Sequence, residues 1–336
     1  MSTHDKEQET TFYEELQKRK EIDLRDNRGK RHDLAFVLLG VIIALLRNRD
    51  GKLSSIHRSM VNMHTSIIEV LGIDNQKVIS RSQLPRILEK VNLKGFEELL
   101  FHHSEIELSQ DEKQWFAGDG KELRGSIQKG DKRGEALVQL VRHEDRAVLG
   151  QGYYNGTKES EKPCLQHLIE QNDAQSQKIT ADALHLHPSM TQIIEQGGGI
   201  FLIGLKENQK ELLQDMKDHI ECFKPINEAL TIDKGHGRLE RRQYYQYDIS
   251  EEYFDPRWDA SCFRTLIQVN RSRIKLKTNE QSDELAFYIS NGESQKNHDY
   301  FHAVRNHWSV EVSNHIRDVS LKEDVFKTKK NLLLAL

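Results

Sequence analysis

In the first third of the chain, apolar residues recur at spacings of three and four, the period of an amphipathic helix. We expect helices throughout 26–108, preceded by a charged lead-in at 1–25. The longest apolar run, 34–46, is shorter than the roughly 20 residues that span a bilayer, so we interpret it as a buried helix and expect no membrane segment. The pattern therefore predicts an all-helical N-terminal domain at 1–108.

Two serine-capped segments of that region, 54–60 and 80–91, combine helical periodicity with arginine side chains. They are typical either of a helix-turn-helix that contacts DNA or of a packing domain that does not. The pattern alone does not separate these two readings.

Residues 113–205 differ, because short apolar and aromatic segments alternate with turn-forming residues. We expect strands at 114–119, 136–142, 147–154, 178–182 and 200–205, and helices at 163–171, starting with Pro163, and at 188–196. A meander that leads into crossover units is typical of a ribonuclease-H-like α/β fold. In that fold the ends of the first and fourth strands lie side by side.

After a helix expected at 207–220, strand-like segments return at 243–249, 262–270 and 284–290. We interpret 221–295 as a β-rich insertion. Helical periodicity resumes at 299–317, and this late helix carries Glu311. The predicted architecture is an α/β, ribonuclease-H-like domain at 109–336 with a β-rich insertion, preceded by the helical domain.

Composition narrows the class of protein. The 336 residues are 36% hydrophobic and 30% charged, which describes a chain with real cores rather than a disordered one. The net charge of −4 argues mildly against nucleic-acid binding, although local basic clusters matter more than the sum. The three scattered cysteines have no C-x-x-C spacing, so we expect neither disulfides nor a structural zinc site, and a cytoplasmic location.

Three acidic residues stand in contexts that favour metal chemistry. Asp119 and Asp182 each close an apolar segment expected to be a strand, and Glu311 lies on the late helix. If the three carboxylates converge, they can hold two divalent ions that activate a nucleophile and stabilise a leaving oxygen in phosphoryl transfer. Mg²⁺ prefers such oxygen ligands. We assign Asp119 to bridge the ions, with Asp182 and Glu311 each holding one.

A competing pattern surrounds Glu311. His307, Glu311 and His315 are spaced by four residues, so a continuous helix would place them on one face, where they could bind zinc. The chain has no H-E-x-x-H signature. We therefore prefer a role for one of the histidines near a scissile phosphate.

Two further stretches contain cationic or amide side chains suited to phosphate. Residues 234–238 place His236 and Arg238 among glycines, although an ordinary basic turn has the same composition. Residues 206–210 follow an expected buried strand, and their amides could contact a base or cap a helix. The candidate DNA contacts are Lys121, Arg124, Lys206, Asn208, His236, Arg238 and His307.

Taken together, these stretches resemble the H-repeat-associated insertion-sequence transposases, a family of the DDE class. The likeness lies in residues 26–32, 118–126, 180–185, 205–209, 235–240, 305–311, 315, 318–319 and 323–324. It implies a ribonuclease-H-like core, dependence on Mg²⁺ or Mn²⁺, and Asp119, Asp182 and Glu311 as the catalytic triad. It further implies double-stranded DNA as the partner, both element ends and target. Since two ends must meet, it favours a homodimer.

The chain also departs from related insertion-sequence families. They place basic residues four before the glutamate and seven after it, where this chain has His307 and Asp318, and 153–161 follows the family pattern loosely. The apolar end at 331–336 replaces a basic tail, so we expect a truncated copy. A truncated or decayed transposase that binds DNA without catalysis, and a general metal-dependent nuclease of the same fold, stay open as alternatives.

Overall fold

The computed structural model describes residues 11–48, 52–103, 106–109, 111–127, 133–154, 157–296 and 299–320. Glu323, Asp324 and the apolar end at 331–336 lie outside these ranges, as does the lead-in before residue 11. The chain divides into two compact units. The helical unit comprises Met1–Ile106, Glu122–Glu135 and Asn314–Leu336, and the sheet unit comprises Glu107–Lys121 and Ala136–Ser313.

The helical unit is built from short and medium helices. They are α1 (Phe12–Lys18), α2 (Leu34–Asn48), α3 (Leu53–Leu71), α4 (Gln83–Leu88) and α5 (Leu93–His103), with short 3₁₀ turns η1 (Lys20–Ile22), η2 (Asn27–Gly29) and η3 (Arg124–Ser126). Helix α1 begins with a capping box: the Thr11 hydroxyl accepts the Glu14 amide, and the Glu14 carboxylate accepts the Thr11 amide. Helix α3 ends where Gly72 adopts a φ of 61°.

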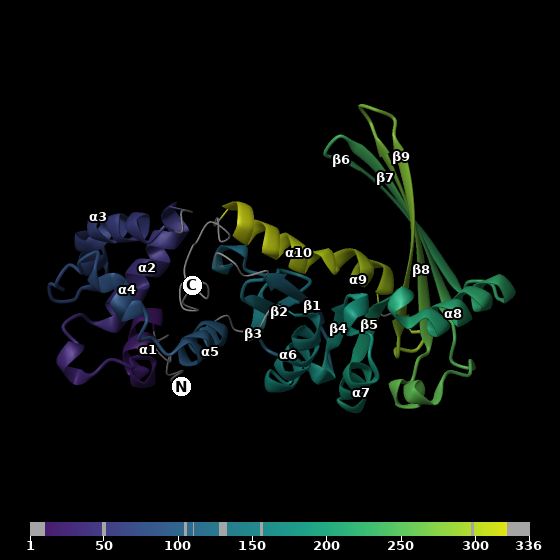
Figure 1. Cartoon of the computed structure of the whole chain (residues 1–336), viewed down its shortest axis with the longest axis horizontal. Coiled ribbons are helices and arrows are strands. Elements are labelled where there is room, and N and C mark those ends of the chain that lie inside the picture. The colour runs from purple at the N-terminus through teal and green to yellow at the C-terminus, as the bar shows by residue number, and fades with distance from the viewer. Residues whose placement is uncertain are drawn as a thin grey trace, which may run out of the picture. The chain divides into compact units, whose positions relative to one another are not determined.

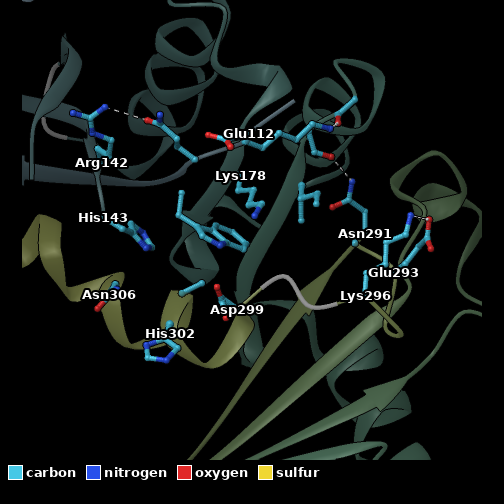
Figure 2. A pocket seen from close by; sticks show the side chains of 18 of the residues that line it. Glu112, Arg142, His143, Lys178, Asn291, Glu293, Lys296, Asp299, His302 and Asn306 are labelled. Carbon is cyan, nitrogen blue, oxygen red and sulfur yellow. Dashed lines mark hydrogen bonds and ion pairs between the residues drawn. The ribbon is translucent and has the colours of Figure 1, made fainter. Parts of the chain in front are cut away.

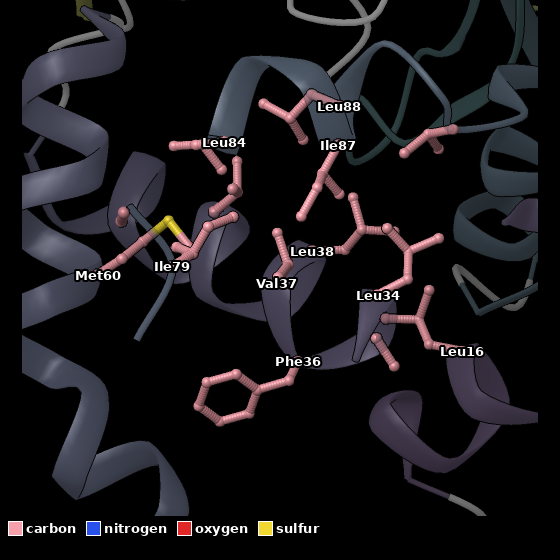
Figure 3. Close-up of a cluster of buried hydrophobic side chains, with 14 of the residues drawn as sticks. Leu16, Leu34, Phe36, Val37, Leu38, Met60, Ile79, Leu84, Ile87 and Leu88 are labelled. Carbon is pink, nitrogen blue, oxygen red and sulfur yellow. The ribbon is translucent and has the colours of Figure 1, made fainter. Parts of the chain in front are cut away.

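A hydrophobic core lies inside this unit, and Figure 3 shows Leu38 of α2 and Leu84 of α4 within it. Ile56 of α3 and Phe96 of α5 are also fully buried there. The apolar run at 34–46 is thus a buried helix, as its length predicted. Of the helices in the described ranges, none is both long and apolar enough to cross a membrane.

The sheet unit contains one nine-stranded sheet in the order β3-β2-β1-β4-β5-β9-β8-β7-β6 (Figure 1). The strands are β1 (Trp115–Glu122), β2 (Ala136–Arg142), β3 (Val148–Tyr154), β4 (Lys178–Ala181), β5 (Ile200–Leu205), β6 (Asn227–Gly235), β7 (Arg238–Asp248), β8 (Thr265–Lys275) and β9 (Gln281–Ser290). Strands β1, β4 and β5 run parallel, and β5 pairs antiparallel with β9. The mixed α/β class predicted from the sequence is confirmed.

The region expected to be an insertion continues this same sheet. Strands β6 to β9 form antiparallel pairs, and β9 joins them to β5 through the register Leu202↔Ser290 to Leu205↔Phe287. Strand β6 was not predicted, because its sequence is polar and almost every residue is exposed, so it lacks alternating burial.

Helices cover the core strands on both faces, α6 and α7 on one and α9 and α10 on the other (Figure 1). The helices are α6 (Lys158–Gln171), α7 (Pro188–Gln196), α8 (Lys210–Cys222), α9 (Tyr300–Asn306) and α10 (Trp308–His315), with short segments η4 (Ala174–Ser176), η5 (Ala183–His185), η6 (Glu207–Gln209) and η7 (Pro256–Ser261). The π-type η8 (Ile316–Ser320), which follows α10, belongs to the helical unit.

Several boundaries differ from the sequence prediction: β7, β8 and β9 start or end at other residues than the segments expected at 243–249, 262–270 and 284–290, and α8 starts and ends later than the helix expected at 207–220. Three further differences concern the candidate site. Helix α6 starts before Pro163, because the Thr157 side chain caps it by accepting the Ser160 amide. Strand β1 does not end at Asp119 but runs on to Glu122. The late helix is not continuous, since it breaks between α9 and α10 at His307.

Candidate active site

The register of two parallel strands brings the two aspartates to the same edge of the sheet. Gly118 of β1 pairs with Ala181 of β4, and Asp119 and Asp182 are the next residues of each chain segment. Neighbouring strands lie about 4.8 Å apart. Residues separated by more than 60 positions are therefore neighbours at the carboxyl end of the parallel strands.

Both aspartates face the α10 side of the sheet, because alternate residues of a strand share a face. Ala117, two residues before Asp119, packs with Val310 of α10. Thr180, two residues before Asp182, contacts His307 at the start of α10. The backbone of Asp182 remains extended, with φ −74° and ψ 173°. Its side chain therefore lies on the same face of the sheet as that of Thr180.

The opposite face of β1 is closed by α6. A Cβ on Gly118 would lie 2.8 Å from Leu165, and one on Gly120 would lie 2.5 Å from the carboxyl carbon of Glu161. The Tyr154 hydroxyl donates to Glu161 Oε2 at 3.0 Å, and His185 Nε2 lies 3.2 Å from Oε1. Glycine at 118 and 120 is thus required by the close approach of this helix.

Burial is the main reason that the pKa of Asp119 rises from its usual value to about 7. Repulsion from Asp182, Glu161 and Glu311 raises it further, while a hydrogen bond from the Gly120 amide acts in the opposite direction. Glu311, on the first turn of α10, is therefore near enough to act on Asp119. Negative charge is concentrated on this edge of the sheet.

Glu311 itself has an exposed side chain with a raised pKa. Partial desolvation raises the pKa, and the positive charges of Arg271 and Lys206 lower it. Lys206 is exposed and directly follows β5. Of the predicted DNA contacts, Lys206 is therefore one that lies close to the carboxylates.

The donors gathered here, carboxylate oxygens, are the ligands that Mg²⁺ prefers, and a divalent cation would relieve the repulsion that acts on Asp119. Within the described ranges, however, no group of three or more His, Cys, Asp or Glu side chains is arranged to hold a metal ion. The carboxylates are close enough to repel one another without forming a preassembled ligand cluster.

His307 also lies near this edge of the sheet. Its Nδ1 lies 3.0 Å from Thr180 Oγ1, and burial lowers its pKa to about 4, against the raising effect of Asp182. At neutral pH it is an uncharged ring. The zinc alternative gains no support, because the described residues contain no group of three His, Cys, Asp or Glu side chains arranged to hold a metal ion around His307 and His315.

Asn208 supports the loop that carries Asp182. The Asp182 carboxylate accepts the Leu184 amide at 2.8 Å, and Asn208 Nδ2 donates to the Ala183 carbonyl at 2.7 Å. Sequence reasoning left a base contact and a capping role open for this amide. In the structure it binds backbone next to Asp182.

His236 and Arg238 lie at a two-residue hairpin turn. Gly235 of β6 pairs with Arg238 of β7, and the two turn residues, His236 and Gly237, have φ of 49° and 73°. Through the registers Leu205↔Phe287, Phe287↔Gln268 and Gln268↔Tyr245, the carboxyl end of β5 is level with Tyr245.

The turn therefore lies about 24 Å beyond that level, at about 3.4 Å per residue of β7. It extends beyond the same edge of the sheet at which the aspartates lie. Strands β6 to β9 therefore flank the carboxylate edge. The structure does not bring His236 or Arg238 to the carboxylates themselves.

The remaining two predicted contacts differ in setting. Lys121 is buried in β1, two residues after Asp119. Arg124 is exposed in η3 and belongs to the helical unit. Glu161, Thr180 and His143 contact or influence the predicted residues without having been predicted. Their contacts depend on strand pairing, which local spacing does not encode.

A cavity of about 920 Å³ lies at the opposite, amino-terminal edge of the parallel strands (Figure 2). Trp115, Lys178 and Ile200, at the starts of β1, β4 and β5, line it. Some of its charges are paired, as in the Lys296–Glu293 ion pair at 2.9 Å. None of the predicted site residues lines the cavity. One lining residue, His143, contacts Thr180, which lies two residues before Asp182.

Comparison with known proteins finds relatives whose sequences are about a quarter identical to this chain. No protein-family model matches the chain. Two Escherichia coli proteins, "H repeat-associated putative transposase YhhI" and "Putative protein YbfL", are each 25% identical over 316 residues, which cover 92% of this chain and 82% of the relative. A third from that species, "H repeat-associated putative transposase YbfD", is 23% identical over 238 residues, covering 69% of this chain and 93% of the relative.

Proposed function

Because the chain is a relative of the H repeat-associated transposases over most of its length, we propose that it is the DNA transposase of an insertion sequence. It would cleave phosphodiester bonds at the element ends and join the freed 3′-hydroxyl to target DNA. The observation that carries this proposal is the neighbouring position of Asp119 and Asp182 at the carboxyl edge of the sheet, together with the repulsion that Glu311 of α10 exerts on Asp119.

The strand order β3-β2-β1-β4-β5, with β1, β4 and β5 parallel, supports a ribonuclease-H-like core. We propose that this core, with strands β6 to β9 as its insertion, forms the catalytic domain at 109–336. The helices of 1–108 would form an associated N-terminal domain.

The triad would hold Mg²⁺, or Mn²⁺ in its place. The bound ions would activate the attacking oxygen and stabilise the leaving oxygen. Asp119, the most enclosed of the three, would hold the ions together with Asp182, which is oriented by the Leu184 amide, and Glu311, which is presented from α10. The chain's own contribution is to hold three anionic donors on one face.

Duplex DNA would lie along the carboxylate edge between the core and the extended strands. Lys206 and Arg271, whose charges act on Glu311, would contact the phosphates nearest the reaction, Arg271 exchanging its ion pair with Glu284 for a phosphate. Arg238 and His236 would contact DNA further along, at the hairpin turn, with Lys121 and Arg124 as additional contacts. Bringing two element ends together would require two copies of the chain.

The test is plasmid nicking with Mg²⁺ or Mn²⁺ by the wild type and by Asp119→Asn, Asp182→Asn and Glu311→Gln. We expect each substitution to lower the nicking rate by about 100-fold or more, because one metal-holding carboxylate is lost. Glu221→Gln, at an exposed carboxylate of α8, is the matched control and should nick at the wild-type rate. Equal activity in Asp119→Asn would refute the assignment.

A second assay separates transposition from simple hydrolysis. An oligonucleotide ending in a 3′-hydroxyl should be joined to plasmid DNA by a transposase, whereas a nuclease of the same fold gives hydrolysis products only.

A decayed transposase that binds DNA without cutting it is the second candidate. It is favoured by the absence, among the described residues, of a preassembled metal-holding group. This candidate predicts DNA binding with no cleavage under any divalent cation, and clean cleavage would reject it.

A further inference from the structure

One buried hydroxyl joins three groups beneath the candidate active site. Thr180, on β4, is 2% exposed. Its hydroxyl donates to the Phe116 carbonyl at 3.3 Å, while His143 Nε2 lies 2.9 Å and His307 Nδ1 3.0 Å from the same oxygen. Three partners surround an atom that carries one proton and two lone pairs.

The three contacts can all be hydrogen bonds in only one arrangement of protons. A carbonyl can only accept, so in that arrangement the single hydroxyl proton goes to Phe116, and both lone pairs of Thr180 accept. His143 then donates through Nε2–H and His307 through Nδ1–H. Both rings are uncharged at neutral pH, since burial lowers the pKa of His143 to about 3 and that of His307 to about 4.

The surroundings of His143 agree with this assignment. Its Nδ1 is buried, and no hydrogen-bond partner for it occurs in the described part of the chain. A bare lone pair is tolerated there better than an orphaned N–H, which is rare in buried positions. The ring stacks on Trp115 with centroids 6.1 Å apart, and Figure 2 shows it at the margin of the cavity. Packing therefore holds His143 in the orientation that donates to Thr180.

We propose that Thr180, supported by His143, is a positioning residue that fixes His307 as the Nδ1–H tautomer, so that Nε2 accepts a hydrogen bond from the attacking hydroxyl at the carboxylate edge. The hydroxyl would be that of water or of a DNA 3′-end. This inference rests on the proposed function, and it adds an acceptor to a site otherwise described by its carboxylates.

The role suits the position of the ring. Nε2 points away from Thr180, and the charges of Asp182 and Lys206 both act on the ring, so it lies among the groups of the site. The carboxylates would be engaged by cations, and Lys206 can only donate. A neutral imidazole can orient an O–H group without competing for the metal charge.

The first experiment reads the tautomer directly by ¹⁵N-edited NMR of histidine-labelled protein at neutral pH. We expect His307 to carry its proton on Nδ1 in the wild type and in Thr180→Ser, which keeps the hydroxyl. Thr180→Val, of similar volume, should lose the single tautomer. Thr191→Val, a buried threonine of α7, is the matched control and should leave the signal unchanged. A proton found on Nε2 in the wild type would overturn the inference.

The second experiment measures nicking. Thr180→Val should lower kcat about tenfold or more while the DNA concentration at half-maximal rate changes little, and Thr180→Ser should restore it. His307→Asn keeps a donor toward Thr180 but lacks Nε2, so it should show the same loss without unfolding. His302→Asn, at an exposed ring of α9, is its control. Wild-type rates in His307→Asn would exclude the acceptor role.

The two experiments distinguish a failure of the proposed function from a failure of the tautomer assignment. If the wild type nicks no DNA, the proposed function and the acceptor role are both refuted. The NMR experiment tests the tautomer independently: loss of the Nδ1–H signal in Thr180→Val supports the positioning role of Thr180, and persistence of that signal overturns it.

Discussion

At the scale of single residues, Asp119 is a carboxyl group whose charged form the fold destabilises. Its carboxyl is enclosed by the sheet, and Asp182, Glu161 and Glu311 all repel its anionic form. A group whose folded-state pKa lies above its unfolded value stabilises the protein at low pH and loses that contribution as the pH rises. The metal-free protein therefore carries a cost at this residue above neutral pH.

We expect the metal-free wild type to lose stability between about pH 4, where an unfolded Asp titrates, and the folded pKa of about 7. The full loss is on the order of 4 kcal/mol. Asp119→Asn should flatten that dependence and raise the melting temperature at pH 8. Added Mg²⁺ should stabilise the wild type at pH 8 but not the variant. Parallel pH profiles for the two proteins would contradict this view of the site.

Sequence patterns locate some of these residues and not others. Asp119 and Asp182 could be found because each follows apolar residues that predict a strand, and the β-β-β-α-β order predicts that the two strands are neighbours. Glu161 and Thr180 act through contacts with β1, made by residues more than 40 positions away in sequence. Such pairs depend on register and helix packing, which single-chain periodicity does not specify.

At the scale of elements, the junction of β5 with β9 is secured by one buried side chain. Asn291, just after β9, accepts the Phe201 amide at 2.8 Å and donates to the Gly199 carbonyl at 3.0 Å and to Glu195. It is 2% exposed, so its partners have no access to water as a substitute. The antiparallel strands are thus attached to the parallel core by backbone pairing and by this amide.

Asn291→Leu should destabilise the protein by about 2–4 kcal/mol, because buried backbone groups at the start of β5 lose their partner. Hydrogen exchange should show faster exchange of the β5 and β9 amides in particular. Asn270→Leu, at an exposed position of β8, is the control and should change stability by less than about 0.5 kcal/mol. Comparable losses in both variants would mean that Asn291 has no special role.

Boundaries of elements were predicted less well than their order. Helix α7 matches its expected range, because Pro188 at its first turn and glycines after its end mark it in the sequence. Helix α6 was expected to start at Pro163, but the cap at Thr157 extends it toward the N-terminus. The break at His307 had no sequence signal, since it accompanies a side-chain bond to β4 rather than a Gly or Pro.

At the scale of the whole molecule, the helical unit has a core of its own. Every buried member of that core lies between Tyr13 and Leu99, so its packing needs no strand of the sheet. Hydrophobic clusters of this kind commonly mark a part of a chain that folds cooperatively.

A fragment of residues 1–106 should therefore be helical by circular dichroism and unfold in a cooperative transition. Leu38→Ala, at a fully buried position, should cost the fragment about 2–5 kcal/mol. Leu46→Ala, where the side chain is 73% exposed, should be close to neutral. A fragment that melts without a transition would show that this core depends on the rest of the chain.

The pairing of β9 with β5 has a mechanical consequence. The hairpin turn of His236 and the strands that carry Asp119 and Asp182 belong to one continuous hydrogen-bonded lattice, with no linker between them. A duplex bound near the turn could not swivel about a hinge to reach the carboxylates. The twist of the sheet would set the angle at which the duplex approaches. A force that DNA exerts on the turn would be transmitted through the paired strands to β5.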